Sequence, residues 1–544
     1  MMWSLLIRKI GFWKQLRRDR KKEDKKGPEQ PENQQPADRK VSEKLSDNLD
    51  FIKSQLGDSG DVKVHEFRFG ENYEFGGALI FIDGLVNMDY ITQGIMRPII
   101  SFPYSKTPLK KGPGHGIDQI SKTVLCSGDI ETKQYLGELI SGILAGDTVF
   151  LADSFQQGLV ISTKGWDKRG VTEPETESVV RGPREGFTEN FRTNTALIRR
   201  KIKSPKLRME HMTIGRKTQT SVCIAYLDGI ANDRVTQQVR SRLKQLDIDS
   251  VLDSGYLEEY IEDAPFSIFA TVGYSEKPDV IASKILEGRT AILVDGSPFV
   301  LTVPFLFVEA FQTAEDYYVR SIYSSIMRLL RFFSYLIAIF APAIYIALTT
   351  FHQELIPTTL LMTIASAREG TPFPAFVEAF VMVLSFEILR EAGLRLPRPV
   401  GQAVSIVGAL VMGDAAVSAG IVGAPMVITV AITAVAGFII PEQNDTISIL
   451  RLIMMILSAA LGGYGIAMGF LGILIHLGLL QSFGIAYFNA FFPTRDMEDT
   501  FIRMPLWAMV KRPTRMAEGD VVRRHFFVPP PKTGQADSQS KGQS

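Results

Sequence analysis

The first long apolar stretch of the chain runs from Phe332 to Phe351. Its sequence, FFSYLIAIFAPAIYIALTTF, contains no charged side chain. A helix of this length can cross a hydrocarbon core of ~30 Å. A buried helix of a soluble protein would also be apolar, but the length and the aromatic residues at both ends favour a membrane span. Pro342 predicts a kink, which neighbouring helices tolerate in a membrane.

Further apolar segments follow as far as residue 492. The expected segments are 374–389, 401–422, 425–440 and 447–492. In the last of these, Gly462, Gly463 and Gly465 predict a break into two spans. We therefore expect an all-α polytopic membrane domain over residues 326–492. It should have about six segments, or four to five if the glutamate-containing or the last segments re-enter the membrane instead of crossing it.

The region before the membrane segments contains an internal repeat. ALIFIDGLVN (78–87) matches CIAYLDGIAN (223–232), and ISGILAGDTVFLAD (140–153) matches ASKILEGRTAILVD (282–295). Each copy predicts a strand, then a helix that ends before a second strand and its hairpin. We predict an α/β soluble region of two related subdomains, 50–180 and 181–325.

The repeated aspartates could be catalytic residues, metal ligands or turn residues. Asp83 and Asp228 each precede a glycine after an apolar strand, and Asp153 and Asp295 begin the predicted hairpin turns. Asp caps a turn through its side chain, and Gly accepts a positive φ. We favour the structural interpretation.

Both ends of the chain are polar. The first 26 residues carry ten bases against three acids, and apolar residues between Trp3 and Trp13 fall at helical spacing. An amphipathic helix on an anionic membrane surface and a disordered basic tail both fit this pattern. We expect residues 1–49 to combine this segment with a Pro/Gln linker. Residues 493–544 should form a cytoplasmic tail that is disordered at its end.

Charge divides the chain into two parts. The totals, 60 Lys+Arg against 59 Asp+Glu, argue against a dedicated nucleic-acid binder, because such proteins are usually basic. Residues 332–492 nevertheless contain only 13 charged residues and no lysine. The two parts therefore suit two solvents, water and lipid.

No motif indicates catalysis or cofactor binding. The globular part contains no P-loop, dinucleotide fingerprint, HExxH helix or nucleophile elbow. Cys126 and Cys223 lack metal-ligand spacing. We expect no enzyme activity, no metal and no cofactor.

Basic residues in the connections predict the orientation of the membrane segments. They are Arg320, Arg328 and Arg331 before the first span, Arg390, Arg395 and Arg398 after the second, and the bases that follow Pro493. By the positive-inside rule these groups face the cytoplasm. Residues 352–373 are then external, and both termini are cytoplasmic.

Four carboxylates fall in or beside the membrane segments: Glu378, Glu387, Glu391 and Asp414. Each costs about 2.5–3.5 kcal/mol to insert, so each needs a partner or water. Glu391 can form an interfacial salt-bridge cluster with neighbouring arginines. Glu378 and Asp414 either face a pore or partner helix, or form buried structural pairs. Asp414 lies in the small-residue sequence GDAAVSAGIVGA, which lets helices approach closely, and a ring of such acids would favour cations.

The connector between the two repeats is rich in arginine. Its candidate binding residues are Arg181, Arg184, Arg192, Arg199 and Arg200. Arginine forks suit carboxylate or phosphate groups of a ligand, a lipid or a partner subunit. A solvated connector is the plainer alternative. We favour docking between subunits or lobes over small-molecule binding.

Three longer motifs resemble a known family. RGPREGFTENFRTN (181–194), AREGTPFPAFVEAF (367–380) and FEILREAGLRLPRPVGQAVSIVGALVMGDAAVSAGIV (386–422) resemble the A subunit of spore germinant receptors, the GerA family. The resemblance runs from about residue 50 to residue 493. It implies a nutrient sensor in the inner membrane of dormant spores, with a transporter-like B subunit and a lipoprotein C subunit. It also implies a homo-oligomer that releases ions when the nutrient arrives.

Three functional hypotheses remain. The first is a receptor subunit that triggers germination by forming or gating an oligomeric ion-conducting path. The second is a secondary transporter, or a scaffold that only transmits the signal of a partner subunit. The membrane region lacks the inverted repeat typical of many transporters. The third, a membrane-anchored enzyme, lacks any nucleophile–base or metal signature.

Overall fold

The computed structural model describes most of the chain between residues 39 and 523. The described residues are 39–57, 59–104, 116–125, 129–165, 174, 177, 179–395, 408, 411–488, 499–509, 512–513, 516–517 and 522–523. The expected N-terminal amphipathic segment and most of the expected tail lie outside them. The chain divides into two compact units. The first comprises residues 1–55, 64–81 and 88–163, and the second comprises 56–63, 82–87 and 164–544.

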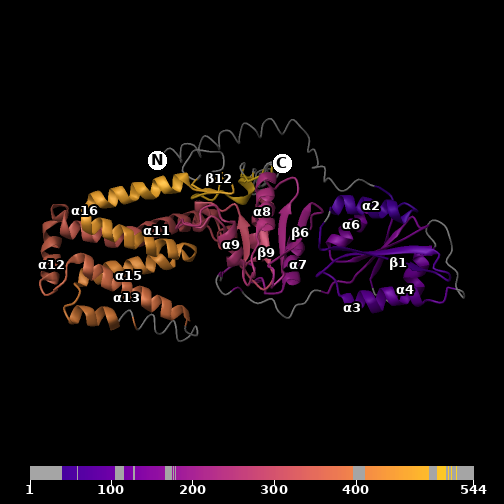
Figure 1. Cartoon of the computed structure of the whole chain (residues 1–544), viewed down its shortest axis with the longest axis horizontal. Coiled ribbons are helices and arrows are strands. Elements are labelled where there is room, and N and C mark those ends of the chain that lie inside the picture. The colour runs from indigo at the N-terminus through magenta and orange to yellow at the C-terminus, as the bar shows by residue number, and fades with distance from the viewer. Residues whose placement is uncertain are drawn as a thin grey trace, which may run out of the picture. The chain divides into compact units, whose positions relative to one another are not determined.

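The first unit is built on the sheet whose strand β1 is labelled in Figure 1. This sheet has five strands in the order β1-β2-β4-β5-β3. Its strands are β1 (Val62–Phe69), β2 (Phe75–Ile82), β3 (Ile130–Lys133), β4 (Thr148–Ala152) and β5 (Gly158–Ile161). Its helices are α2 (Leu45–Leu56), α3 (Met88–Tyr90), η1 (Ile91–Met96), α4 (Arg97–Ser101), α5 (Gly116–Gln119), η2 (Ile120–Val124) and α6 (Leu136–Leu144). Every residue of β4 is buried, as expected for a central strand.

The second unit begins with another five-stranded sheet, of order β6-β7-β9-β10-β8. Its strands are β6 (Leu207–Ile214), β7 (Thr220–Leu227), β8 (Gly273–Ser275), β9 (Thr290–Val294) and β10 (Val300–Val303). Its helices are α7 (Phe191–Lys201), α8 (Asp233–Gln245), α9 (Ser254–Ile261) and α10 (Pro278–Leu286). Taken in chain order, the strands of the two sheets occupy the same positions. The expected α/β region is therefore confirmed, with two sheets of one topology.

The repeated Asp-Gly pairs form turns, as predicted. Gly84 follows β2 with φ +87°, and Gly229 follows β7 with φ +78°. In the β9–β10 hairpin Gly296 has φ +84°, and at the corresponding position of the first hairpin Ser154 has φ +70°. A positive φ is costly for most residues with a Cβ, which accounts for the glycines.

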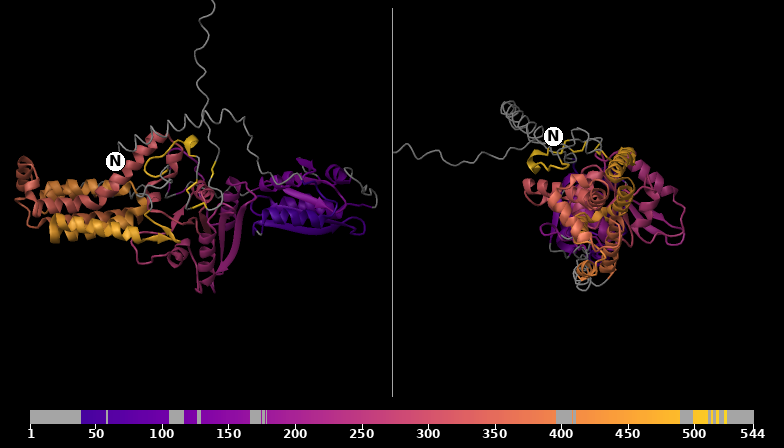
Figure 2. Two further views of the ribbon diagram at one scale, coloured as in Figure 1. Left: turned by 90° about the horizontal axis from the view of Figure 1, so that it is seen from above. Right: turned by 90° about the vertical axis from the view of Figure 1, so that its left-hand side faces the viewer.

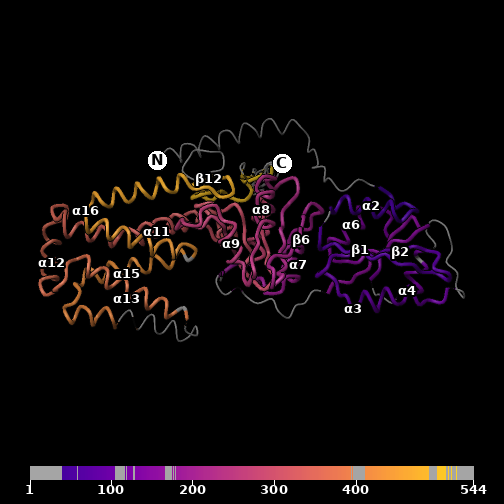
Figure 3. Tube along the Cα trace, viewed as in Figure 1, coloured from indigo at the N-terminus to yellow at the C-terminus, as the bar shows by residue number. Residues whose placement is uncertain are grey.

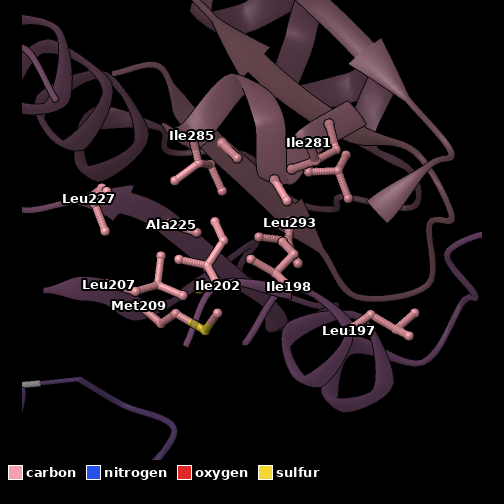
Figure 4. Close-up of a cluster of buried hydrophobic side chains, with 14 of the residues drawn as sticks. Leu197, Ile198, Ile202, Leu207, Met209, Ala225, Leu227, Ile281, Ile285 and Leu293 are labelled. Carbon is pink, nitrogen blue, oxygen red and sulfur yellow. The ribbon is translucent and has the colours of Figure 1, made fainter. Parts of the chain in front are cut away.

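Helices cover both faces of the second sheet. Leu197 and Ile198 of α7 and Ile281 and Ile285 of α10 pack with strand residues on one face (Figure 4). On the other face, a separate core contains residues of α8 and α9, including Val239 and Leu257. The sheet is thus the middle of three layers.

A helical region follows the second sheet and is traced in Figure 3 and seen from two further directions in Figure 2. Its long helices are α11 (Ser321–Thr350), α12 (Thr358–Arg368), α13 (Ala375–Arg395), α15 (Ala424–Phe438) and α16 (Asn444–Leu479), and residues 411–418 are also helical. Shorter elements are η3 (Phe307–Phe311), η4 (Ala314–Tyr317), η5 (Gln353–Leu355), η6 (Pro441–Gln443), β11 (Gln481–Ser482), β12 (Ile485–Ala486) and η7 (Leu506–Ala508).

The predicted break near Gly462 is present. Gly462 has φ +60° and ψ −138°, so the two halves of α16 are separate helices on either side of it. The halves pack against each other, because a Cβ on Gly469 would lie 2.6 Å from Sδ of Met454. The chain therefore reverses direction at Gly462 and forms a helical hairpin.

The expected count of six membrane segments is not confirmed. Among the described residues, α11 and α16 are long and apolar enough to cross a membrane, and α15 is a shorter apolar helix. α13 covers the expected segment 374–389, but it carries several charged residues. Much of the expected segment 401–422 lies outside the described residues.

Candidate functional site

Glu378 joins three helices at one buried point. Its side chain is 1% exposed. Oε1 accepts hydrogen bonds from Arg368 at the end of α12, at 3.2 Å from Nε and 3.0 Å from Nη2. Oε2 accepts from the backbone N–H of Gly423, the N-cap of α15, at 3.1 Å. A buried carboxylate needs such partners, and the positive end of a helix dipole adds to them.

Glu387 belongs to a second ionic cluster, between α13 and α16. It pairs with Arg390 at 2.7 Å and with Arg451 at 3.2 Å, and it accepts a hydrogen bond from Ser448 at 3.0 Å. Arg451 is 2% exposed. Its Nε also donates to the carbonyl of Ala338 in α11 at 2.9 Å. This cluster holds α11, α13 and the first half of α16 together.

The other two membrane carboxylates are exposed. Glu391 pairs with Arg395 at 2.6 Å across one turn of α13. Asp414 lies on the helical residues 411–418, and no ion pair or hydrogen bond of its side chain is found within the described part of the chain. The four candidates are thus not gathered into one site within this single chain.

Arg199 is the most buried of the five connector arginines, at 1% exposure. Its guanidinium forms a two-bonded pair with Asp61, with both N–O distances 2.9 Å. It also donates to Ser59 Oγ at 3.1 Å and to the carbonyl of Leu207 at 3.2 Å. Arg199 therefore fastens the segment that precedes β1 to the second sheet.

The remaining connector arginines lie nearer the surface. Arg192 forms an ion pair with Asp83, and Arg200 forms one with Glu185. Arg181 and Arg184 are exposed. Arg192, Arg199 and Arg200 therefore have carboxylate partners inside the second unit.

A buried ionic network surrounds the start of α11. Arg328, which is fully buried, donates from Nε to Asp316 of η4 at 2.9 Å and from Nη1 to Asp499 at 2.8 Å. Arg331 also pairs with Asp316, at 2.9 Å. Burial raises the pKa of Asp499, and Arg328 opposes that rise. The network ties α11 to the segment before it and to Asp499, which lies beyond α16.

Phe483 anchors the other end of the membrane region. It lies between β11 and β12, directly after α16, and its side chain is 2% exposed in the core that also contains α8 and α9. Arg242 of α8 lies 4.4 Å from the ring centroid, and Asp263 accepts the Phe483 N–H. Phe483 has φ +48°. A residue with a Cβ keeps this conformation only where its surroundings hold it.

Comparison with known proteins decides the family. A family model described as "Bacillus/Clostridium GerA spore germination protein" matches residues 50–515. The chain belongs to the GerA family. The three motifs that resemble germinant receptor A subunits all lie within this match.

Relatives within the GerA family are similar over most of their length. "Spore germination protein KA" of Bacillus subtilis (strain 168) is 44% identical over 488 residues, which cover 89% of each chain. "Spore germination protein B1" of the same organism is 40% identical and covers 89% of this chain and 99% of that protein. The length and pattern of this sequence also resemble the GerK A subunit in particular. These names describe germination proteins and not enzymes.

A solved structure matches about half of the chain. It is the crystal structure of the N-terminal domain of the A subunit of the Bacillus megaterium spore germinant receptor GerK3. It is 34% identical, with a TM-score of 0.40, and covers 49% of this chain and 98% of that one.

Sequence reasoning missed the anchors at the two ends of this GerA-family membrane region. Arg328 and Arg331 contributed only to the charge bias, although their spacing places them on one helix face, close in sequence to Asp316. Phe483 gives no comparable signal, because it is one apolar residue among many after α16. Its partners, Arg242 and Asp263, are more than 200 residues away in the sequence.

Proposed function

We propose that this chain is the A subunit of a nutrient germinant receptor and that it forms or gates an oligomeric ion-conducting path in the spore inner membrane. In this proposal it is a multi-pass protein of about six segments with both termini in the cytoplasm. It acts with a transporter-like B subunit, a lipoprotein C subunit and further copies of itself.

The observation that carries the proposal is a double attachment: α11 is tied to the segment that follows β10, and the end of α16 is tied to the core of the second sheet. The Arg328 network lies at the start of α11, and Phe483 lies directly after α16. α11 and α16 also pack against each other and share a core with Phe269, Phe305 and Phe307. A rearrangement of the second sheet therefore moves the first and last helices together.

The membrane carboxylates divide between two roles in this proposal. Glu378 and Glu387 hold helices together, because arginines neutralise them at close range. Asp414 is exposed on a helix of small residues and is the candidate for lining a path between copies of the chain. The alternatives are a secondary transporter and a scaffold that transmits a partner's signal.

The current of the purified receptor complex in planar bilayers, with and without nutrient, tests the proposal. We expect Asp414→Asn to lower the nutrient-dependent cation current. Glu391→Gln is the matched control, because Glu391 is also exposed but has a local partner in Arg395. Glu378→Gln should act mainly by loosening the helices, which a thermal unfolding measurement detects.

The outcomes separate the alternatives. An unchanged current in Asp414→Asn would remove Asp414 from the path. If the unaltered complex carries no nutrient-dependent current at all, the conducting role fails. Uptake of nutrient into vesicles would then favour the transporter, and its absence would favour the scaffold.

A further inference from the structure

One loop of the second sheet lies against the open end of the α16 hairpin. Ser267 Oγ and His476 Nε2 are 3.0 Å apart, and Thr446 Oγ1 donates to the carbonyl of Ile268 at 2.6 Å. Thr446 is in the first turn of α16 and His476 is in its last turn. Because the chain reverses at Gly462, both residues mark the same end of the hairpin, and the loop meets the helices there.

The residue beside these contacts is a fully exposed phenylalanine. Phe266 is 101% exposed, while its neighbours Ile268 and Phe269 pack into the core shared with α11 and α16. A phenylalanine left in water forgoes about 1.5–3 kcal/mol of burial energy. The loop therefore presents a large apolar side chain where the helices leave their apolar region.

Two further exposed aromatic side chains lie on α9, which ends five residues before Phe266. Tyr256 and Tyr260 are one turn apart and are 43% and 56% exposed. On the adjacent face of the helix, about 100° away, Leu257 and Ile261 are buried in the core of the second sheet. α9 is thus held through one face and exposes aromatic rings on the next. We call Tyr256, Tyr260 and Phe266 the α9 aromatic strip.

The charged residues near the α9 aromatic strip indicate what kind of surface can bind it. Residues 246–270 contain seven acidic residues and no lysine or arginine. The nearby Arg242 of α8 donates to the carbonyl of Ile261 and to Asp263, which neutralises it. Attraction to anionic headgroups is therefore not what holds the strip. Aromatic side chains bind the membrane–water interface through their amphipathic or apolar rings and need no positive charge for this.

We propose that the α9 aromatic strip dips into the interfacial zone of the cytoplasmic leaflet, with Phe266 deepest. The occupant is the lipid surface itself. Tyr260 lies nearer to Phe266 along the chain than Tyr256, so the depth of insertion decreases from Phe266 to Tyr260 to Tyr256. The second sheet is then held against the membrane by lipid as well as by the helices. This inference rests on the membrane placement of α16 in the proposed function.

Tryptophan fluorescence of the full-length protein in nanodiscs tests the proposal. The variants Phe266→Trp, Tyr260→Trp and Tyr256→Trp are compared with the unaltered protein, whose own tryptophans give the background. Lipids brominated near the glycerol quench a nearby indole. We expect a blue-shifted, strongly quenched signal from position 266, weaker quenching at 260 and the weakest at 256. Phosphatidylglycerol and high salt should leave this order unchanged.

A fourth variant separates this inference from the proposed function. Phe470→Trp places the probe on the second half of α16, where Phe470 is 43% exposed. Quenching at position 470 but not at 266 overturns the proposed contact between the α9 aromatic strip and lipid. The membrane placement of α16 then still holds, and the strip is either exposed to water or bound to protein. Absence of quenching at both positions overturns the membrane placement as well. Quenching at 266 that depends on phosphatidylglycerol overturns the uncharged mode of contact.

Discussion

Arg451 donates a 2.9 Å hydrogen bond from Nε to the carbonyl oxygen of Ala338 in the neighbouring helix α11. Ala338 lies four residues before Pro342, and proline has no N–H to offer the carbonyl four residues earlier. Arg451 therefore supplies the donor that the helix itself lacks. A buried arginine and a proline inside an apolar helix are each unfavourable alone. Here the arginine donates to the carbonyl of Ala338, which the proline leaves without a donor.

We expect Arg451→Leu to lower the stability of the protein by about 1–3 kcal/mol, because it leaves a buried carbonyl without a donor. Thermal unfolding in detergent measures the loss. Pro342→Ala restores an N–H at residue 342, so the double variant should regain part of the stability. No recovery in the double variant would mean that Ala338 is not the group that Arg451 satisfies.

Removing the buried pair of the connector should have a larger effect. Arg199→Leu leaves Asp61 charged and buried, which costs about 3–5 kcal/mol. Arg181→Leu is the matched control in the same connector, because Arg181 is exposed, and it should change stability by less than about 0.5 kcal/mol. Chemical denaturation of the two variants decides between a structural and a surface role for Arg199. Equal effects would contradict the structural role.

The reversal of α16 should depend on the glycine at residue 462. Gly462→Ala introduces a Cβ at φ +60°, 2.8 Å from the Phe351 ring, so we expect marked loss of folded protein. Gly472→Ala is the control within the same helix. A Cβ there meets nothing within 4 Å, and alanine should be neutral or stabilising by about 0.5–1 kcal/mol. Size-exclusion profiles and thermal unfolding compare the two.

Glu258 on α9 predicts a pH dependence. Burial, with Glu262 and Asp253 nearby, raises the pKa of Glu258 from 4.5 to about 7. The folded state therefore holds this proton more tightly than the unfolded chain, and its contribution to stability is full below pH 4.5 and lost as pH rises through about 7. Glu258→Gln should remove this loss, so the variant gains stability relative to the unaltered protein above pH 7. Glu259→Gln, at the exposed neighbour, is the control in the same melting series.

Phe483→Ala should uncouple the second sheet from α16. Truncation of a buried phenylalanine costs about 3–5 kcal/mol. We expect the nutrient response of spores that carry the variant to fall more than the amount of receptor in the membrane. Phe483→Leu keeps much of the buried volume and should retain part of the response. A response that follows receptor amount alone in both variants would contradict coupling through Phe483.

The features that could be predicted from sequence are local. The Asp-Gly turns follow from two adjacent residues, and the break at Gly462 follows from three nearby glycines. The repeat predicted two sheets of one kind, because motif order and spacing reflect chain order. The ion pair of Glu378 with Arg368 could also have been predicted, because the two residues are only ten apart in the sequence.

What could not be predicted depends on contacts between distant residues. Arg451 and Ala338 are 113 residues apart, and Arg199 and Asp61 are 138 apart. A single sequence shows that Arg451 needs a partner but not which carbonyl or carboxylate supplies it. The number of spans stays a prediction. The charges of α13 are compensated by Arg390, Arg451 and Ser448 in three dimensions, which a hydropathy pattern does not represent.

The hairpin that carries Phe483 also sets an order of assembly. Strands β6 to β10 and helices α7 to α10 leave the ribosome before α11 does, yet the side chain that fills their core emerges only after α16. Domains generally fold as units during synthesis, N-terminal ones first, so the position beside Arg242 that Phe483 occupies is filled only after α16 has been made. The core of the second sheet is therefore complete only in chains whose synthesis has passed the end of α16.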